Sequence, residues 1–340
     1  MEGEHKTAPI EISADHDDDA SILAEFEMPE HRVEWTDVKG AQDVKDALKE
    51  CILLPLKFPA LFKGMRVPHR GILLLGAPGT GKTLLARALQ TEAGRDVTCF
   101  YVHAWDLLGK YSGDPEEKLR ALFSAAQSRE PAIIFLDDIE VIGSDSENDQ
   151  NRSACNEMLI GFSQLQNNVF VVGLTHAPWA INLALLKRFS KRLYMPLPDT
   201  DARTDILGAQ LRSMDHTLTQ EHLRSLSSRC AGFSGSDLVV LVRDVAMEPV
   251  RRLQAATHFK KVNKSQLEET TCSEDDMYMY IPCAPDDPVA MEMTWTEIPE
   301  HSLGPLPVNM EDVLKCLEKT KPTISQDELR KFDEFDENKY

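Results

Sequence analysis

The 340-residue chain has no apolar run long enough to span a membrane, and its first residues carry no secretory signal. Its seven cysteines are odd in number and include no C-x-x-C pair, which favours free thiols in a reducing compartment. There is no internal repeat, no low-complexity tract and no metal-ligand spacing. We therefore expect a cytoplasmic protein that meets membranes only indirectly.

A surplus of basic residues is also missing, since the formal net charge is −19. Residues 1–30 hold ten acids and one lysine, and residues 265–301 hold ten acids and neither lysine nor arginine. The remaining acids and bases cancel, so two acidic segments are attached to a nearly neutral core. Such a chain is a poor general binder of nucleic acid or anionic lipid, and we expect no nucleic-acid partner.

A complete phosphate-binding loop lies between a strand-like and a helical segment. The apolar run of residues 72–75 precedes it, and apolar residues at helical spacing follow it. The loop matches G-x-x-x-x-G-K-[ST], and its residues are Gly76, Ala77, Pro78, Gly79, Thr80, Gly81, Lys82 and Thr83. Its backbone N–H groups and the helix N-terminus would bind the phosphates of ATP. Lys82 would reach the β- and γ-phosphates, and Thr83 would ligate Mg²⁺.

A second buried strand, residues 132–136, ends in Asp137 and Asp138. Asp137 is expected to hold the Mg²⁺ through its water shell. Asp138 stands where most ATPases of this kind have a glutamate that orients the attacking water. Aspartate is one methylene shorter, and moving such a carboxylate back by about 1 Å can lower the rate by on the order of 100-fold. We therefore expect that hydrolysis is slow or that the backbone has moved to compensate. Glu140 is interpreted as a solvated or structural carboxylate.

The pattern along the chain predicts five regions. Residues 1–32 are expected to be a disordered acidic tail, and residues 33–198 alternate helix and strand as a large α/β domain does. Residues 199–258 and 309–324 carry helical periodicity and form a small helical domain. Residues 259–308 interrupt it as an acidic β insertion. Residues 325–340 form a C-terminal helix that Ser325 and Glu328 can cap.

Beyond these patterns, the chain resembles the AAA ATPases, and within them the vacuolar protein sorting ATPases that disassemble ESCRT-III polymers. The resemblance runs from Val33 to the C-terminus. Its most specific stretches are residues 243–252 (RDVAMEPVRR), 256–261 (ATHFKK), 291–295 (MEMTW) and 319–323 (KTKPT). The first thirty acidic residues are not expected to form the family's N-terminal microtubule-interacting-and-trafficking domain, which needs three helices. Either the sequence is truncated, or the protein recruits substrate through another subunit.

The resemblance implies a fold and further site residues. The expected fold is an AAA module, with a large α/β domain around a five-stranded parallel sheet and a small helical domain carrying a β insertion; ATP would bind at their junction. The adenine would be bordered by Asp37, Val38 and Gly40. The nucleotide site would be closed by residues 232–237, among them Gly235 and Ser236. A first pore loop that grips polypeptide would comprise Lys110, Tyr111, Ser112 and Gly113, and a second would lie near Asp145 and Arg152.

Two further positions depart from the family. The polar sensor residue, usually asparagine, is His176, which can also hydrogen-bond water or phosphate. The arginine-finger run reads Lys187-Arg188-Phe189, so Arg188 is kept, while Lys187 has charge without the bidentate fork. Together with Asp138, these changes weaken the hydrolysis machinery and leave the binding loop intact.

The sequence therefore predicts an ATP-dependent hexameric motor that threads ESCRT-III-like polypeptide past Tyr111, with Arg188 acting across subunits. An activating cofactor protein would bind the acidic insertion, and recruitment would be peripheral, at endosomal membranes. The first alternative is a weakly active regulatory subunit that co-assembles with an active paralogue. A microtubule-severing ATPase is disfavoured by the acidic tail, and a small-molecule kinase would not combine the pore-loop and finger positions.

Overall fold

The computed structural model describes residues 26–29, 32–108, 114–144, 149–166, 168–263 and 278–337. The expected first pore loop, Asp145 and most of the acidic tail lie outside these residues. The chain forms two compact units. Unit 1 contains Met1–Ala77, Gly81–Pro196 and Arg330–Tyr340, and unit 2 contains Pro78–Thr80 and Leu197–Leu329.

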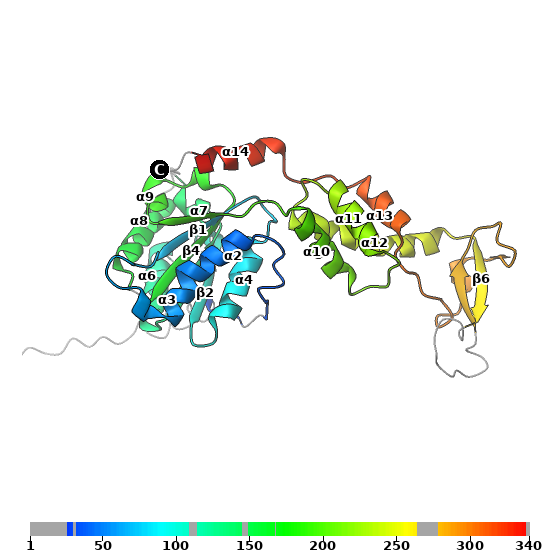
Figure 1. Cartoon of the computed structure of the whole chain (residues 1–340), viewed down its shortest axis with the longest axis horizontal. Coiled ribbons are helices and arrows are strands. Elements are labelled where there is room, and N and C mark those ends of the chain that lie inside the picture. The colour runs from blue at the N-terminus through cyan, green and yellow to red at the C-terminus, as the bar shows by residue number, and fades with distance from the viewer. Residues whose placement is uncertain are drawn as a thin grey trace, which may run out of the picture. The chain divides into compact units, whose positions relative to one another are not determined.

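A parallel sheet, of which Figure 1 labels β1, β2 and β4, forms the centre of unit 1. Its five strands lie in the order β2-β3-β4-β1-β5. The strands are β1 (Gly71–Leu75), β2 (Thr98–His103), β3 (Ala132–Asp137), β4 (Val169–Thr175) and β5 (Lys191–Tyr194). Strands β1, β3 and β4 are buried at every residue, as continuous apolar runs covered on both faces require. The predicted α/β fold with a five-stranded parallel sheet is confirmed.

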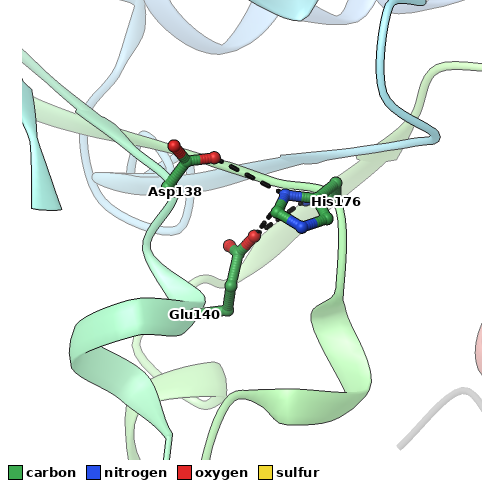
Figure 2. Close-up of side chains that lie close together, drawn as sticks. All are labelled: Asp138, Glu140 and His176. Carbon is green, nitrogen blue, oxygen red and sulfur yellow. Dashed lines mark hydrogen bonds and ion pairs between the residues drawn. The ribbon is translucent and has the colours of Figure 1, made fainter. Parts of the chain in front are cut away.

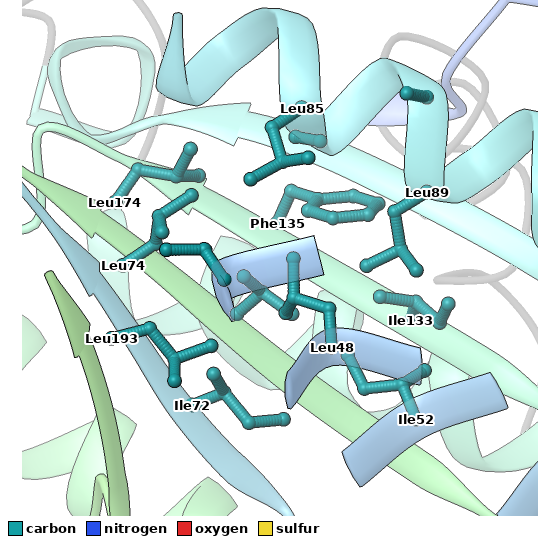
Figure 3. Packing of buried hydrophobic residues seen from close by; sticks show 14 of the residues in the cluster. Leu48, Ile52, Ile72, Leu74, Leu85, Leu89, Ile133, Phe135, Leu174 and Leu193 are labelled. Atoms are coloured by element: carbon teal, nitrogen blue, oxygen red, sulfur yellow. The ribbon is translucent and has the colours of Figure 1, made fainter. Parts of the chain in front are cut away.

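Helices cover both faces of this sheet. They are α2 (Gln42–Leu48), η1 (Lys49–Leu53), α3 (Leu54–Lys57), η2 (Pro59–Leu61), α4 (Lys82–Ala93), α5 (Ala104–Leu108), α6 (Pro115–Ser128), α7 (Glu140–Gly143), α8 (Asp149–Gln164), η3 (Pro178–Ala180) and α9 (Leu183–Leu186). Figure 3 shows Leu48 and Ile52 of α2–η1 and Leu85 and Leu89 of α4 packed on one face, against Phe135 and other strand residues. Because α4 is buried against the strands, the phosphate-binding loop that precedes it is held between two fixed elements.

Helices α6 and α8 pack together through aromatic side chains. The rings of Phe123 and Phe162 lie 6.2 Å apart, and Phe162 meets Phe189 edge to face at 5.1 Å. A Cβ at Gly161 would come within 2.5 Å of the Phe123 ring, so this glycine permits the close approach of the two helices.

Residues 26–29 correct the expected start of the ordered chain at residue 33. Phe26 and Met28 are buried, and Glu27 forms an isolated antiparallel bridge with Phe100 of β2. The Met28 N–H donates to the Cys99 carbonyl at 2.9 Å. Two apolar anchors within an acidic stretch are therefore enough to fix its end beside the edge strand.

Unit 2 is built mainly from helices. They are α10 (Thr200–Leu211), α11 (Gln220–Arg229), α12 (Gly235–Ala255) and α13 (Met310–Leu317). Side-chain caps start each of them, and those of α11, α12 and α13 are reciprocal capping boxes. Among the described residues, no helix is both long and apolar enough to cross a bilayer.

The predicted β insertion is an antiparallel sheet in the order β7-β6-β8. Its strands are β6 (His258–Asn263), β7 (Tyr278–Pro282) and β8 (Met291–Glu292), followed by the 3-10 turn η6 (Trp295–Glu297). Lys260 pairs with Asp287, and the Lys261 ammonium lies 4.2 Å from the centre of the Tyr278 ring. One acidic residue of the insertion is thus paired with a lysine of β6, and the second lysine lies over an aromatic ring.

The last helix, α14 (Gln326–Glu337), begins at the predicted cap. Ser325 and Glu328 exchange hydrogen bonds between side chain and backbone in both directions. From Arg330 onward the helix belongs to unit 1. There the Phe332 ring is almost fully buried, 5.0 Å from the Trp179 ring and 5.7 Å from the Tyr194 ring.

Candidate functional site

The sheet order brings the candidate residues of unit 1 to one edge. Strand β1 ends in the phosphate-binding loop, β3 ends at Asp137, and β4 is followed by His176. Since β4 pairs with both β1 and β3, these three ends are neighbours. The carboxyl edge of such a sheet is where open α/β folds bind their ligands.

The loop has the backbone that its glycines predict. Gly79 and Gly81 have φ values of 74° and 102°, which disfavour any residue with a side chain. Helix α4 begins directly after Gly81, at Lys82. The Lys82 ammonium donates to the carbonyls of Gly76 and Ala77, at 2.7 and 3.0 Å. Burial lowers the pKa of Lys82 from 10.5 to about 8, although nearby carboxylates, Asp137 foremost, oppose the shift.

Thr83 and Asp137, the two expected metal ligands, are in contact. The Thr83 hydroxyl donates to the Asp137 Oδ2 atom at 3.1 Å. The hydroxyl of Tyr101, on β2, donates to the same oxygen. Burial is the larger cause that raises the pKa of Tyr101, and this hydrogen bond raises it further. Nothing in the sequence pattern singled out Tyr101. It comes near Asp137 only because β2 pairs with β3, in a register that places His103 opposite Asp137.

Asp138 has a left-handed backbone, with φ at +55°. Its N–H donates to Asp137 Oδ1 at 3.0 Å, which fixes the turn that follows β3. Aspartate and asparagine tolerate this conformation better than longer side chains do. The backbone at Asp138 is therefore in an unusual conformation for a residue with a side chain.

Glu140 was expected to be a solvated or a structural carboxylate, and its burial shows that the first interpretation is wrong. It is 7% exposed, and its Oε1 atom lies 2.5 Å from His176 Nδ1 (Figure 2). His176 Nδ1 is 3.5 Å from Asp138 Oδ1 as well. This pairing could not be predicted from local patterns, because 36 positions separate the two residues and only the adjacency of β3 and β4 brings them together.

In unit 2, the residues expected to close the nucleotide site form the start of α12. Ser234 caps the helix, and its backbone N–H donates to Asp237 at 2.9 Å. Within the same unit, the Ser236 N–H donates to the Gly79 carbonyl at 3.1 Å. A Cβ at Gly235 would come 3.1 Å from that carbonyl, so Gly235 and Ser236 border the tip of the phosphate-binding loop.

The remaining candidates are placed in separate parts of unit 1. Val38 is buried, and its carbonyl accepts a bond from Lys45 at 2.5 Å, which orders the turn of Asp37 and Gly40. Lys187 and Arg188 follow α9 and are exposed. Arg152, expected near the second pore loop, lies on α8.

Comparison with known proteins places this geometry in a family. The model of the "ATPase family associated with various cellular activities (AAA)" matches residues 72–197, and an AAA+ lid domain matches 212–268. A Vps4 C terminal oligomerisation domain matches residues 280–338. The human vacuolar protein sorting-associated protein 4A is 41% identical over 93% of this chain and 73% of its own length. The chain belongs to the vacuolar protein sorting-associated protein 4 family of AAA ATPases.

Other Vps4 relatives agree with this assignment. Vacuolar protein sorting-associated protein 4 of Dictyostelium discoideum is 36% identical over 93% of this chain and 71% of its own. Among solved structures, the FIGL-1 AAA domain superimposes with a TM-score of 0.74 at 28% identity, covering 94% of this chain and 95% of the other. As a Vps4-family AAA ATPase, the chain binds and hydrolyses ATP and forms oligomers.

Proposed function

We propose that this chain is a motor that uses ATP hydrolysis to disassemble ESCRT-III-type polymers by threading polypeptide through a hexameric pore. The observation that carries the proposal is the 41% identity to vacuolar protein sorting-associated protein 4A, which spans the ATPase core and the C-terminal oligomerisation domain. Recruitment to endosomal membranes and an activating partner at the β insertion belong to the same proposal.

The residues present fit a magnesium ion. Thr83 and Asp137 offer a hydroxyl and a carboxylate oxygen that already lie 3.1 Å apart beside the phosphate-binding loop. Oxygen ligands of this kind are those that Mg²⁺ prefers. We propose that Thr83 and Asp137 hold the ion, which would neutralise phosphate charge when bound.

The chain's own residues would do the rest. The loop backbone and Lys82 bind the phosphates, and Lys82 would exchange its two carbonyl partners for phosphate oxygens. Asp138 is proposed to lie near the attacking water. Arg188 is exposed, and in a neighbouring subunit it would neutralise developing charge. Tyr111, outside the described residues, is the proposed pore residue.

The test is steady-state ATP hydrolysis measured against protein concentration, with ATP affinity measured in parallel. A self-assembling motor gives turnover per subunit that rises cooperatively with concentration, and ESCRT-III-type filaments incubated with it shorten only when ATP is present. Filaments that persist beside an actively hydrolysing enzyme would overturn the proposed substrate.

The regulatory-subunit alternative is favoured by one observation, the left-handed Asp138 that stands in place of a glutamate. It predicts tight ATP binding with negligible turnover at every concentration, and turnover restored only when an active paralogue is added. A microtubule-severing activity predicts cosedimentation with microtubules at low salt, which acidic segments disfavour because tubulin tails are acidic too.

A further inference from the structure

The ends of β3 and β4 hold a carboxylate–imidazole pair that the proposed hydrolysis has not used. Glu140 Oε1 lies 2.5 Å from His176 Nδ1 and accepts a longer bond, 3.4 Å, from the His176 backbone N–H. Figure 2 shows the Glu140 carboxylate facing the imidazole, with Asp138 directed toward the same ring nitrogen, Nδ1. The two contacts fix both the backbone and the ring of His176.

This contact determines which ring nitrogen of His176 carries the proton. A carboxylate has no hydrogen to donate, so Nδ1 must be the donor at 2.5 Å. In the neutral ring, Nε2 is then left with a free lone pair that can accept a proton. The His176 side chain is 47% exposed, so water can reach the ring.

The environment of Glu140 is unusual for a purely structural carboxylate. Its side chain is 9% exposed, and its Oε2 atom is buried with no hydrogen-bond partner among the described residues. A buried carboxylate with one oxygen unpaired carries a desolvation cost that few contacts here offset. The Glu140 carboxylate faces His176 Nδ1 and is placed to stabilise positive charge on the ring.

Asp138 is less suited to the same task. Its Oδ1 is 3.5 Å from His176 Nδ1, too far for a strong hydrogen bond, and its shorter side chain starts from a left-handed backbone. Asp138 is nevertheless bonded through its N–H to Asp137, the proposed metal ligand. The pair therefore lies next to the phosphate end of the site.

We propose that Glu140 is a positioning residue and His176 the base that activates water, taking over the role of the glutamate that Asp138 replaces. The inference rests on the proposed ATP hydrolysis. The water oxygen bonds to the γ-phosphorus, the bond from that phosphorus to the bridging oxygen breaks, and ADP leaves with the electron pair. The water proton passes to His176 Nε2, Glu140 stabilises the imidazolium, and the proton is then released to solvent.

The test combines single-turnover hydrolysis with a readout of the His176 ring. Glu140→Ala, His176→Ala and the double variant are compared, with exposed Glu92→Gln as the matched control. Each single variant should lower the hydrolysis rate about 100-fold, within the range typical of general-base catalysis, with ATP affinity unchanged. The double variant should be no slower than His176→Ala, because the two residues act as one unit.

The ring itself is read by ¹⁵N NMR on the full chain labelled at histidine, with the His176 signals assigned from His176→Asn. The wild type should show a protonated Nδ1 and an unprotonated Nε2, and Glu140→Ala should shift the population toward the other tautomer. Glu140→Gln, whose amide oxygen can still accept from Nδ1–H, should keep the tautomer but lose part of the rate.

The outcomes separate the two proposals. An enzyme that hydrolyses ATP normally after Glu140→Ala, or that loses rate additively in the double variant, overturns the assigned pair and leaves the motor intact. A wild-type chain with no turnover at any concentration overturns the proposed function, and the catalytic role of the pair with it. Loss of ATP binding or of thermal stability in Glu140→Ala alone would reduce Glu140 to a structural residue.

Discussion

At the scale of single residues, the backbone of Asp138 limits what can replace it. A non-glycine residue at φ +55° has its Cβ close to its own carbonyl oxygen, which costs roughly 1–2 kcal/mol. Asp138→Gly should therefore be more stable than Asp138→Ala by about 1 kcal/mol, measured by urea denaturation.

The same conformation affects the obvious repair of the site. Asp138→Glu restores the usual side chain but places it on a backbone that suits aspartate better. We expect Asp138→Glu to unfold at lower urea concentration than the wild type. Equal stability of all four proteins would mean that the turn relaxes when its side chain changes.

Lys82 gives a prediction that depends on pH. In the folded chain its pKa is lowered by burial to about 8, whereas in the unfolded chain it is near 10.5. Between these values the unfolded chain binds more protons, so this residue makes the free energy of unfolding rise with pH. As the pH rises from 8 to 10.5, the melting temperature of the wild type should therefore increase relative to that of Lys82→Met. Exposed Lys63→Met is the control and should follow the wild type.

At the scale of elements, Glu248 connects two helices of unit 2. It lies on α12, is 2% exposed, and contacts Lys315 of α13 and Arg251 at 2.6 Å each. Its pKa is lowered from 4.5 to about 2, first by the bond from Lys315 and then by that from Arg251. A carboxyl whose folded pKa is depressed stabilises the fold above its unfolded pKa and loses that contribution as pH falls.

Glu248→Gln should accordingly lower the melting temperature at neutral pH, and the gap to the wild type should close as pH falls from 4.5 toward 2. Thermal melts across that range measure it, and exposed Glu311→Gln serves as the matched control. A gap that stays constant with pH would show that lost packing, not the ion pairs, explains the effect.

Elements also show how far the sequence could lead. The strands β1, β3 and β4 and the Ser325 cap were predictable because apolar runs and capping pairs are local patterns. The Glu140–His176 pair and the Tyr101 bond to Asp137 were not, because each depends on which strands become neighbours. Residues 26–29 were misjudged because acidic composition hid two buried apolar side chains.

At the scale of the whole molecule, the Arg188 prediction concerns pairs of subunits. Arg188→Ala should lower kcat by about 10³-fold with ATP affinity unchanged, because the guanidinium acts on a neighbour's nucleotide. Exposed Arg212→Ala is the matched control. Mixing Arg188→Ala with Lys82→Ala should restore part of the activity, since the Lys82→Ala subunit cannot use its own nucleotide site but can supply Arg188 to the site of the Arg188→Ala subunit. Mixtures no more active than their components would contradict action across subunits.

The C-terminal helix has a consequence for how the protein is made. Phe332 completes a ring cluster with Trp179 and Tyr194. Unit 1 therefore combines residues that precede Leu197–Leu329 of unit 2 in the sequence with residues that follow it. During synthesis, the ribosome must release nearly the entire chain before that cluster can close. Translation that stalls within unit 2 would leave Trp179 and Tyr194 uncovered, and the nascent large domain would be a substrate for chaperones until the final helix arrives.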